Sequence, residues 1–161
     1  MRVLPADPDP RLIVSCDGAA RGNPGPAGIG VVLSDERGRT LATVARGIGP
    51  ATNNVAEYTA ALEGLRLAAE HGATRVLVRS DSRLLVEQLA GRFRVKNPTL
   101  IRLHTEVRRL AGEFDEVLFE HVPRELNAEA DELANRGVDD WLANEGRDYS
   151  RPEPPPMLGD G

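Results

Sequence analysis

The spacing of hydrophobic and polar residues along the 161-residue chain changes period several times. Short apolar runs bounded by turn residues predict strands over residues 11–17, 27–35, 40–49, 74–81 and 116–122. Apolar residues that recur every three or four positions predict helices over residues 53–72, 82–91, 99–114 and 124–144. The expected element order is therefore β-β-β-α-β-α-α-β-α.

This order predicts how the strands pair. Short connections join the first three strands, which is typical of an antiparallel meander. The strand–helix–strand steps around 74–81 and 116–122 require parallel pairing with right-handed crossovers. We therefore expect an α/β fold with a mixed five-stranded sheet flanked by helices. Asn53 or Asn54 can cap the start of the first helix, and Gly72 fits its end.

The length and the two ends of the chain suggest one domain with two extensions. We expect a disordered arm over residues 1–9, a single domain over 10–146 and a Pro-rich tail or linker over 147–161. No apolar run approaches the roughly 20 residues of a membrane helix, and the first residues lack the apolar core of a signal peptide. Cys16 is the only cysteine, so no internal disulfide can form, and a cytoplasmic protein without a membrane partner is expected.

Charge is unevenly distributed along the chain. The net charge of −5 argues against a general nucleic-acid binder. Residues 79–109, however, carry 8 basic and 3 acidic side chains, whereas residues 110–161 carry 4 basic and 14 acidic ones. The basic middle segment is compatible with a local phosphate-binding face or with a solvated helix surface, and charge alone favours the second interpretation.

Four carboxylates fall at positions where acids are unusual. Asp17 and Asp81 end two predicted strands, and ligand sites in open α/β sheets tend to lie outside the carboxyl ends of strands. Glu57 and Asp131 lie among apolar residues near the starts of two predicted helices. Each acid alone has an ordinary explanation as a turn residue, a helix cap or a surface charge. Together they would repel one another, and a divalent cation such as Mg²⁺ or Mn²⁺ would relieve that repulsion.

Four segments around these acids carry a resemblance to a known family. They are "CDGAARGNPGPAGIG", "TNNVAEYTAALEGL", "VLVRSDSRLLVEQL" and "NAEADELAN". In this order and spacing the chain resembles type 1 ribonuclease H over roughly residues 10–145, and in particular an archaeal and actinobacterial-like branch. The fold of that family agrees with the element order obtained from periodicity alone.

The resemblance implies a catalytic metal centre. Asp17, Glu57, Asp81 and Asp131 match the family's acids, which bind two Mg²⁺ ions and cleave the RNA strand of RNA–DNA hybrids to 5′-phosphate and 3′-hydroxyl ends. In the family pattern Asp17 bridges both ions, Glu57 and Asp81 hold one, and Asp131 helps to hold the other. Mn²⁺ is a possible substitute. Glu129 is a fallback ligand, although the N-x-x-A-D pattern favours Asp131.

The resemblance also implies contacts with the substrate. Asn23 and Asn54 match positions that read the 2′-hydroxyl of RNA, and Thr52 and Asn53 match positions that contact the DNA strand and its phosphate. Gly18 lies in the same loop as Asn23 and is expected to line the substrate site. The "TNN" segment also has the simpler interpretation of a helix cap.

The chain departs from the family pattern in two places. Many members carry a catalytic histidine in a Gly-rich loop before the last helix, and "HVPRELNAEAD" has no such loop. Arg124 is the candidate for that catalytic position, with a surface residue at a helix start as the plain alternative, and His121 is expected to be structural. Some members also insert a basic helix and loop after the second helix, where this chain offers Arg92, Arg94 and Lys96 as a smaller phosphate contact.

The leading hypothesis is a monomeric endonuclease specific for RNA–DNA hybrids, with activity on RNA–RNA duplexes also compatible with the resemblance. The alternative is a non-catalytic hybrid-binding module of the same fold. Transposase-like and resolvase-like nucleases need longer chains with DNA-binding appendages, so they fit less well. Some relatives of this branch carry a fused phosphatase-like domain after a Pro-rich segment, and "SRPEPPPMLG" resembles the start of such a linker, with a disordered tail as the alternative.

Overall fold

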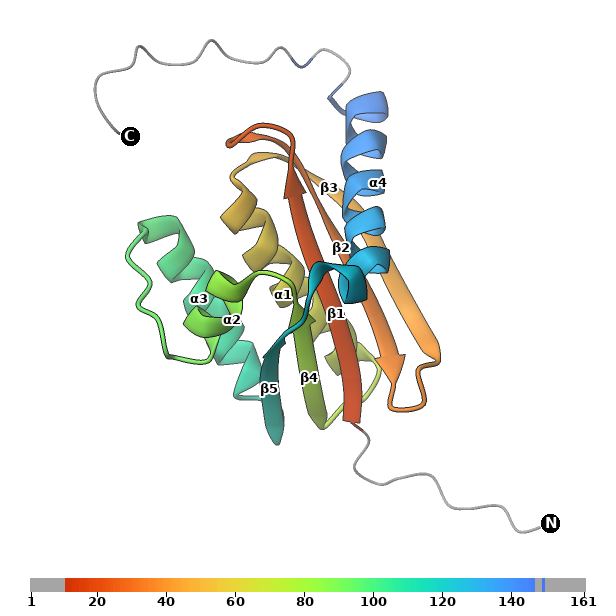
Figure 1. The fold of residues 1–161 in the computed structure, drawn as a ribbon, viewed down its shortest axis with the longest axis vertical. Coiled ribbons are helices and arrows are strands. Elements are labelled where there is room, and N and C mark those ends of the chain that lie inside the picture. Colours follow the sequence, from red (N-terminus) through yellow and green to blue (C-terminus); the bar gives the residue numbers. More distant parts are fainter. Residues whose placement is uncertain (1–10, 147–148, 150–161) are drawn as a thin grey trace, which may run out of the picture.

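The computed structural model describes residues 11–146 and Tyr149, and Figure 1 shows how its elements are arranged. The expected arm over residues 1–9 and, apart from Tyr149, the expected tail over 147–161 lie outside the described residues. The elements are β1 (Arg11–Ala20), β2 (Gly25–Asp35), β3 (Thr40–Ala51), α1 (Asn53–Glu70), β4 (Arg75–Ser80), α2 (Arg83–Leu89), α3 (Pro98–Ala111), β5 (Glu116–His121), the 3₁₀ helix η1 (Arg124–Asn127) and α4 (Ala128–Asn144).

The strands form one five-stranded sheet in the order β3-β2-β1-β4-β5 (Figure 1). β1, β2 and β3 pair antiparallel, as the short connections predicted. β4 pairs parallel with β1 and with β5, as the strand–helix–strand steps predicted. The predicted α/β class and the mixed sheet are confirmed.

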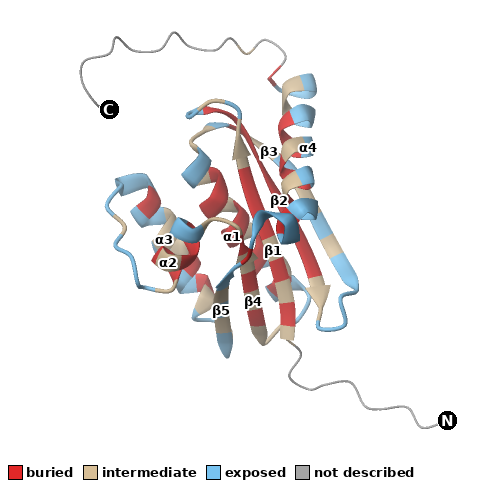
Figure 2. Ribbon diagram, viewed as in Figure 1, coloured by how far each residue is buried: buried red, intermediate tan, exposed pale blue. Residues whose placement is uncertain are grey.

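Helices cover both faces of this sheet. Gly64 of α1 lies against Val14, at a distance that leaves no room for a Cβ, so α1 packs closely on one face. Gly30 of β2 lies against the backbone of Ala130 in α4. Because Gly30 and its neighbour Val31 point to opposite faces of β2, and Val31 faces α1, helix α4 covers the other face. Figure 2 shows that the buried residues concentrate on the central strands and on the sheet-facing sides of the helices.

The loop between β1 and β2 is shorter than the sequence predicted. β1 does not end at Asp17 but continues to Ala20, and β2 already begins at Gly25. The hairpin register runs on to Ala20 opposite Ala27, so the turn occupies only residues 21–24. Gly18 was misread as a turn residue. Its ideal Cβ would lie 2.3 Å from the carbonyl carbon of Ala56, so this glycine lets α1 approach β1.

The helix starts also differ from the expectations in detail. Thr52, and not Asn53 or Asn54, caps α1 by accepting a hydrogen bond from the backbone amide of Val55. The stretch predicted as one helix over 124–144 divides into η1 and α4, which meet at Asn127. Within the described residues, no helix is both long and apolar enough to span a lipid bilayer.

Candidate active site

The candidate site lies where β1 extends beyond the end of its neighbour β4. The last pair between these strands joins Ser15 and Arg79, and β4 ends one residue later at Ser80. β1 continues past this point along β2 alone. Asp17 therefore lies beside a gap in the sheet, and Asp81 is the first residue after β4. Asp81 thus follows the carboxyl end of β4, as predicted, whereas Asp17, predicted at the end of β1, lies inside β1 just beyond its pairing with β4.

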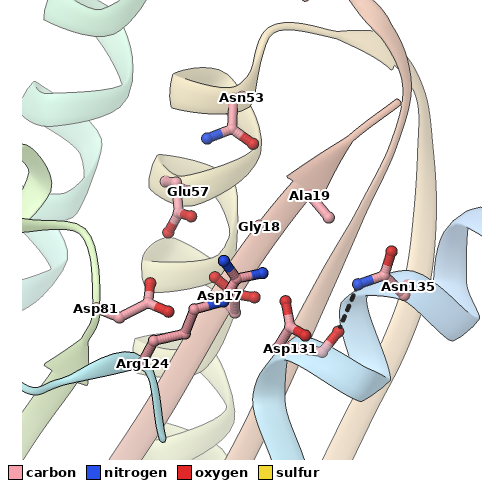
Figure 3. A pocket seen from close by; sticks show the side chains of 9 residues that line it. All are labelled: Asp17, Gly18, Ala19, Asn53, Glu57, Asp81, Arg124, Asp131 and Asn135. Carbon is pink, nitrogen blue, oxygen red and sulfur yellow. Dashed lines mark hydrogen bonds between the residues drawn. The ribbon is translucent and has the colours of Figure 1, made fainter. Parts of the chain in front are cut away.

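Three carboxylates converge at this gap. One oxygen each from Asp17, Glu57 and Asp81 lies within 4.8 Å of the other two. Asp17 is 4% exposed and Glu57 is 5% exposed, so two of the three acids are buried. They line a pocket of about 430 Å³ into which their side chains point (Figure 3). The full lining is Asp17, Gly18, Ala19, Asn53, Glu57, Asp81, Arg124, Asp131 and Asn135.

The surroundings of these acids oppose their ionisation. The pKa of Asp17 is raised from 3.8 to about 7, chiefly by burial and then by its hydrogen bond with Asp131 and the charge of Asp81. The pKa of Glu57 lies well above its ordinary value because the side chain is buried and faces the charge of Asp17. Burial also raises the pKa of Asp81, and the positive charge of Arg124 opposes that rise. The protein alone therefore holds a cluster of carboxylates that it stabilises poorly in their charged form.

The ordinary explanations for the individual acids do not account for this cluster. Ser82, not Asp81, caps α2 by accepting from the amide of Leu85. Glu57 is buried rather than a surface charge, and Asp17 lies within a strand rather than in a turn.

The donor set fits a divalent cation. Glu57 Oε2 is buried and has no hydrogen-bond partner among the residues that the structure describes. An unpaired buried carboxylate oxygen beside two other carboxylates is an environment that a hard cation such as Mg²⁺ or Mn²⁺ would satisfy with oxygen ligands. The fourth predicted acid, Asp131, lines the same pocket from the first turn of α4 (Figure 3). The fallback acid Glu129 does not line this pocket.

Arg124 and His121 take different places around Asp81. Arg124 is exposed, begins η1 and lines the carboxylate pocket. His121 is the last residue of β5, and its Nε2 lies 3.2 Å from the backbone carbonyl oxygen of Asp81. The histidine thus contacts the backbone beside the pocket without lining the pocket.

The residues expected to contact substrate fall into separate groups. Gly18 and Asn53 line the carboxylate pocket. Asn23, Thr52 and Asn54 instead line a neighbouring pocket of about 230 Å³. The Oδ1 of Asn23 accepts a hydrogen bond from the Asn53 amide at 3.0 Å, which joins the two groups.

Asn97 and Thr99, which the sequence did not mark as site residues, also line that neighbouring pocket. They come from the start of α3, where Asn97 caps the helix by accepting from the Thr99 and Leu100 amides. An Asn-Pro pair at the start of a helix is a signal for a cap and not for a pocket. Asn135, which lines the carboxylate pocket, was also missed.

The three basic residues of the connection between α2 and α3 are not part of the lining of either pocket. Arg92, Arg94 and Lys96 are exposed and line neither of them. Arg92 is already engaged, because its Nε and Nη2 donate to both carboxylate oxygens of Glu87 at 2.6 and 3.1 Å. Arg94 and Lys96 remain the cations of this segment for which the structure gives no ion pair among the described residues.

Comparisons with known proteins agree with the fold. A family model described as "Reverse transcriptase-like" matches residues 15–137. Bifunctional protein Rv2228c of Mycobacterium tuberculosis is 45% identical over 130 residues, which cover 80% of this chain and 36% of that protein. Ribonuclease HI of Halobacterium salinarum is 42% identical over 138 residues, which cover 86% of this chain and 69% of that protein.

A solved structure is similar as well. LC11-RNase H1, in a crystal structure with an RNA/DNA hybrid, is 45% identical and has a TM-score of 0.78, with 81% of this chain and 99% of that chain covered. The chain spans about a third of the length of the mycobacterial relatives it matches, 36%. We conclude from the mixed sheet, the acids at its gap and these similarities that the chain belongs to the ribonuclease H family and, within it, resembles the type 1 enzymes.

Proposed function

We propose that this chain is an endonuclease that hydrolyses the RNA strand of RNA–DNA hybrids and leaves 5′-phosphate and 3′-hydroxyl ends. The observation that carries the proposal is the convergence of Asp17, Glu57 and Asp81 within 4.8 Å of one another in an open pocket. The similarity to a ribonuclease H solved with an RNA/DNA hybrid supports the choice of substrate.

The four acids would hold two Mg²⁺ ions, with Mn²⁺ as a possible substitute. Asp17 is the candidate to bridge both ions, Glu57 and Asp81 to hold one of them, and Asp131 to help hold the other. Two bound ions would stabilise the attacking water and the leaving 3′ oxygen of an in-line displacement. The buried, mutually repelling carboxylates would supply the negative charge that balances these ions. The raised pKa values of Asp17 and Glu57 indicate that the charged carboxylates are unfavourable when no ion is bound.

Arg124 is proposed as the catalytic group that stands where many relatives carry a histidine. It lines the pocket, and its charge lowers the pKa of Asp81 against the effect of burial. We expect Arg124→Ala to lower kcat at least about ten-fold, and His121→Ala to do much less because His121 does not line the pocket and lies against the backbone carbonyl of Asp81. A larger loss in the histidine variant would contradict this placement.

Substrate contacts are proposed around both pockets. Asn23 and Asn54 would face the minor groove, where the 2′-hydroxyl distinguishes RNA from DNA, and Gly18 would line the substrate site beside the acids. Asn53 and Thr52 are proposed to contact the DNA strand and its phosphate. The Thr52 hydroxyl already caps α1, so capping and substrate contact would coexist at Thr52.

The basic connection is proposed as a weaker contact with substrate phosphates. Arg92, Arg94 and Lys96 are exposed, and Arg92 would first have to leave Glu87. Their contribution should appear as a KM that rises with salt, because phosphate contacts release bound counterions. A KM unchanged between low and high salt would contradict it.

A substrate panel tests the proposed function. The full chain is incubated with RNA–DNA hybrid, RNA–RNA duplex and DNA duplex of one sequence, in Mg²⁺, in Mn²⁺ and in EDTA. We expect metal-dependent cleavage of the hybrid, with RNA–RNA duplex as a second, weaker substrate. Asp17→Asn should bind the hybrid without cleaving it, and Asp139→Asn, a change at an exposed acid paired with Arg21, should cleave normally.

The alternative is a non-catalytic module that only binds hybrids. It predicts hybrid binding with no cleavage in either metal, and that outcome would replace the proposed function. Cleavage by Asp17→Asn at a rate near that of the wild type would refute the metal-centre assignment as well.

The cellular setting is proposed from the cysteine content. We propose a cytoplasmic protein, because a single cysteine excludes internal disulfides. We further propose that it acts as a monomer. The name of the mycobacterial relative, "Bifunctional protein", and its greater length support a further domain, expected to be phosphatase-like, in a longer protein.

A further inference from the structure

One buried polar side chain beside the carboxylate pocket has no role in the proposed function. Asn127 joins η1 to α4 and is 2% exposed. Its Nδ2 donates to the backbone carbonyl oxygen of Cys16 at 3.0 Å. Its Oδ1 is buried and has no hydrogen-bond partner within the described part of the chain. Burying an amide whose oxygen has no hydrogen-bond partner is unfavourable, so the burial of Asn127 at this place needs an explanation.

The bond reaches β1 at the gap in the sheet. Ser15 is the last residue of β1 that pairs with β4, so Cys16 is the first residue beyond the parallel ladder. Asp17, the central acid of the pocket, follows Cys16 directly. The carboxamide of Asn127 therefore holds β1 at the point where a strand neighbour is lost and where the position of Asp17 is set.

In the sequence, Asn127 lies between two residues that line the carboxylate pocket. Arg124 precedes Asn127 by three positions, one turn of 3₁₀ helix, and Asp131 follows it by four, about one turn of α helix. Both line the pocket with Asp17 (Figure 3). One hydrogen bond, between residues 111 positions apart, thus ties the segment that carries Arg124 and Asp131 to the strand that carries Asp17.

We propose that Asn127 is a positioning residue that sets Arg124 and Asp131 against Asp17 through its hydrogen bond to the Cys16 carbonyl. The inference rests on the proposed function, because it assigns these three side chains to one metal-dependent site. It predicts that loss of the bond impairs metal binding and turnover and leaves the affinity for the hybrid nearly unchanged.

Two variants separate the hydrogen bond from the fold. Asn127→Leu keeps the branched arrangement of the side chain with a larger volume, and Asn127→Ala has a smaller volume. Both variants remove the donor together with the unpaired Oδ1 and add no charge to the buried site. The matched control is Asn144→Ala, which removes an exposed amide that also donates to a backbone carbonyl, that of Asp140.

The expected result is a separation of kinetic constants at a temperature where circular dichroism shows every variant folded. For both Asn127 variants kcat should fall about ten-fold or more, with KM for the hybrid changed less than about two-fold. Mg²⁺ should bind at least about five-fold more weakly by calorimetry without substrate. Asn144→Ala should match the wild type in all three quantities.

A readout without metal or substrate completes the test. In EDTA, amide hydrogen exchange across residues 124–131 should be faster in the Asn127 variants, and exchange in α1 should not change. Wild-type kcat, Mg²⁺ affinity and exchange in both variants would overturn the inference and leave the proposed function intact. If the wild type cleaves no hybrid, the proposed function fails, and the calorimetry and exchange data still decide whether Asn127 positions the acidic cluster. A loss that appears only in KM would also overturn the inference.

Discussion

Replacing Asp17 by asparagine should stabilise the metal-free protein while it abolishes cleavage. Asp17 is 4% exposed and faces the carboxylates of Glu57 and Asp81 within 4.8 Å. Asparagine keeps the shape of the side chain and removes its charge. The variant therefore loses the cost of burying a charge, together with the repulsion from the neighbouring acids, which the wild type bears whenever no cation is bound.

The raised pKa of Asp17 gives the size and the sign of the effect. Its carboxyl titrates at about 7 in the folded protein against 3.8 without the fold. Between these values the folded state holds more protons than the unfolded state, so the free energy of unfolding falls as pH rises. A shift of about 3 units corresponds to about 4 kcal/mol above pH 7, and to only about 0.5 kcal/mol at pH 4. Because the neighbouring acids share the repulsion, we expect about 2–4 kcal/mol for Asp17→Asn at pH 8.

Urea and thermal unfolding in EDTA between pH 4 and 9 measure this directly. For a domain of this length the expected gain corresponds to a Tm about 10 °C above that of the wild type at pH 8. Near pH 4 the two proteins should converge. Mg²⁺ should raise the Tm of the wild type, because a ligand of the folded state stabilises it, and should do much less for Asp17→Asn.

A matched substitution on the surface separates this effect from a general loss of negative charge. Asp139 is exposed and paired with Arg21 at 2.7 Å, so Asp139→Asn should change the free energy of unfolding by no more than about 0.5 kcal/mol. If Asp17→Asn is no more stable than the wild type at pH 8, or if its advantage is the same at pH 4, then repulsion in a buried cluster is the wrong account of the site.

Three further substitutions test how the fold supports the site. Gly18→Ala places a Cβ 2.3 Å from the carbonyl carbon of Ala56, so it should cost at least about 2 kcal/mol in urea unfolding; wild-type stability would mean that α1 packs less closely. Tyr58→Phe removes the donor that lies 2.5 Å from the buried Gln88 Oε1 and should cost about 1–3 kcal/mol, measured the same way. Thr52→Ala removes the cap of α1 and should cost about 1 kcal/mol; a larger fall in hybrid affinity than in stability would assign its hydroxyl to the substrate.

Much of the fold was predictable because its signals are local. Alternation and helical spacing predicted the five strands and the four α-helices, and the connections between them predicted the parallel and antiparallel pairing. Some errors are local, such as the cap of α1 and the separate helix η1. The error at Gly18 has a distant cause: this glycine, predicted to lie in the loop, remains in β1 and makes room for α1, whose approach no local pattern reveals.

The same difference between local and distant signals applies to the residues of the candidate site. Asp17 and Glu57 stood out in the sequence because a carboxylate at a strand end or among apolar residues conflicts with its local surroundings, and such conflicts concentrate at functional sites. Asn97 and Asn127 present no such conflict. A neutral amide at a helix start is expected there whatever else it contacts, so its position in the sequence says nothing of a pocket or of a bond to Cys16.

The difference between acids and amides as sequence signals has a physical basis, which applies to all the residues around the gap between β1 and β4. A buried charge is costly wherever it stands, so its residue type alone marks the acids of the pocket. A buried amide is costly only if it is unpaired, and its pairing depends on where the chain returns 111 residues later. The groups proposed to perform the chemistry can therefore be recognised from the sequence. The groups proposed to position them, above all Asn127, can be recognised only from the structure, which places the start of α4 beside β1.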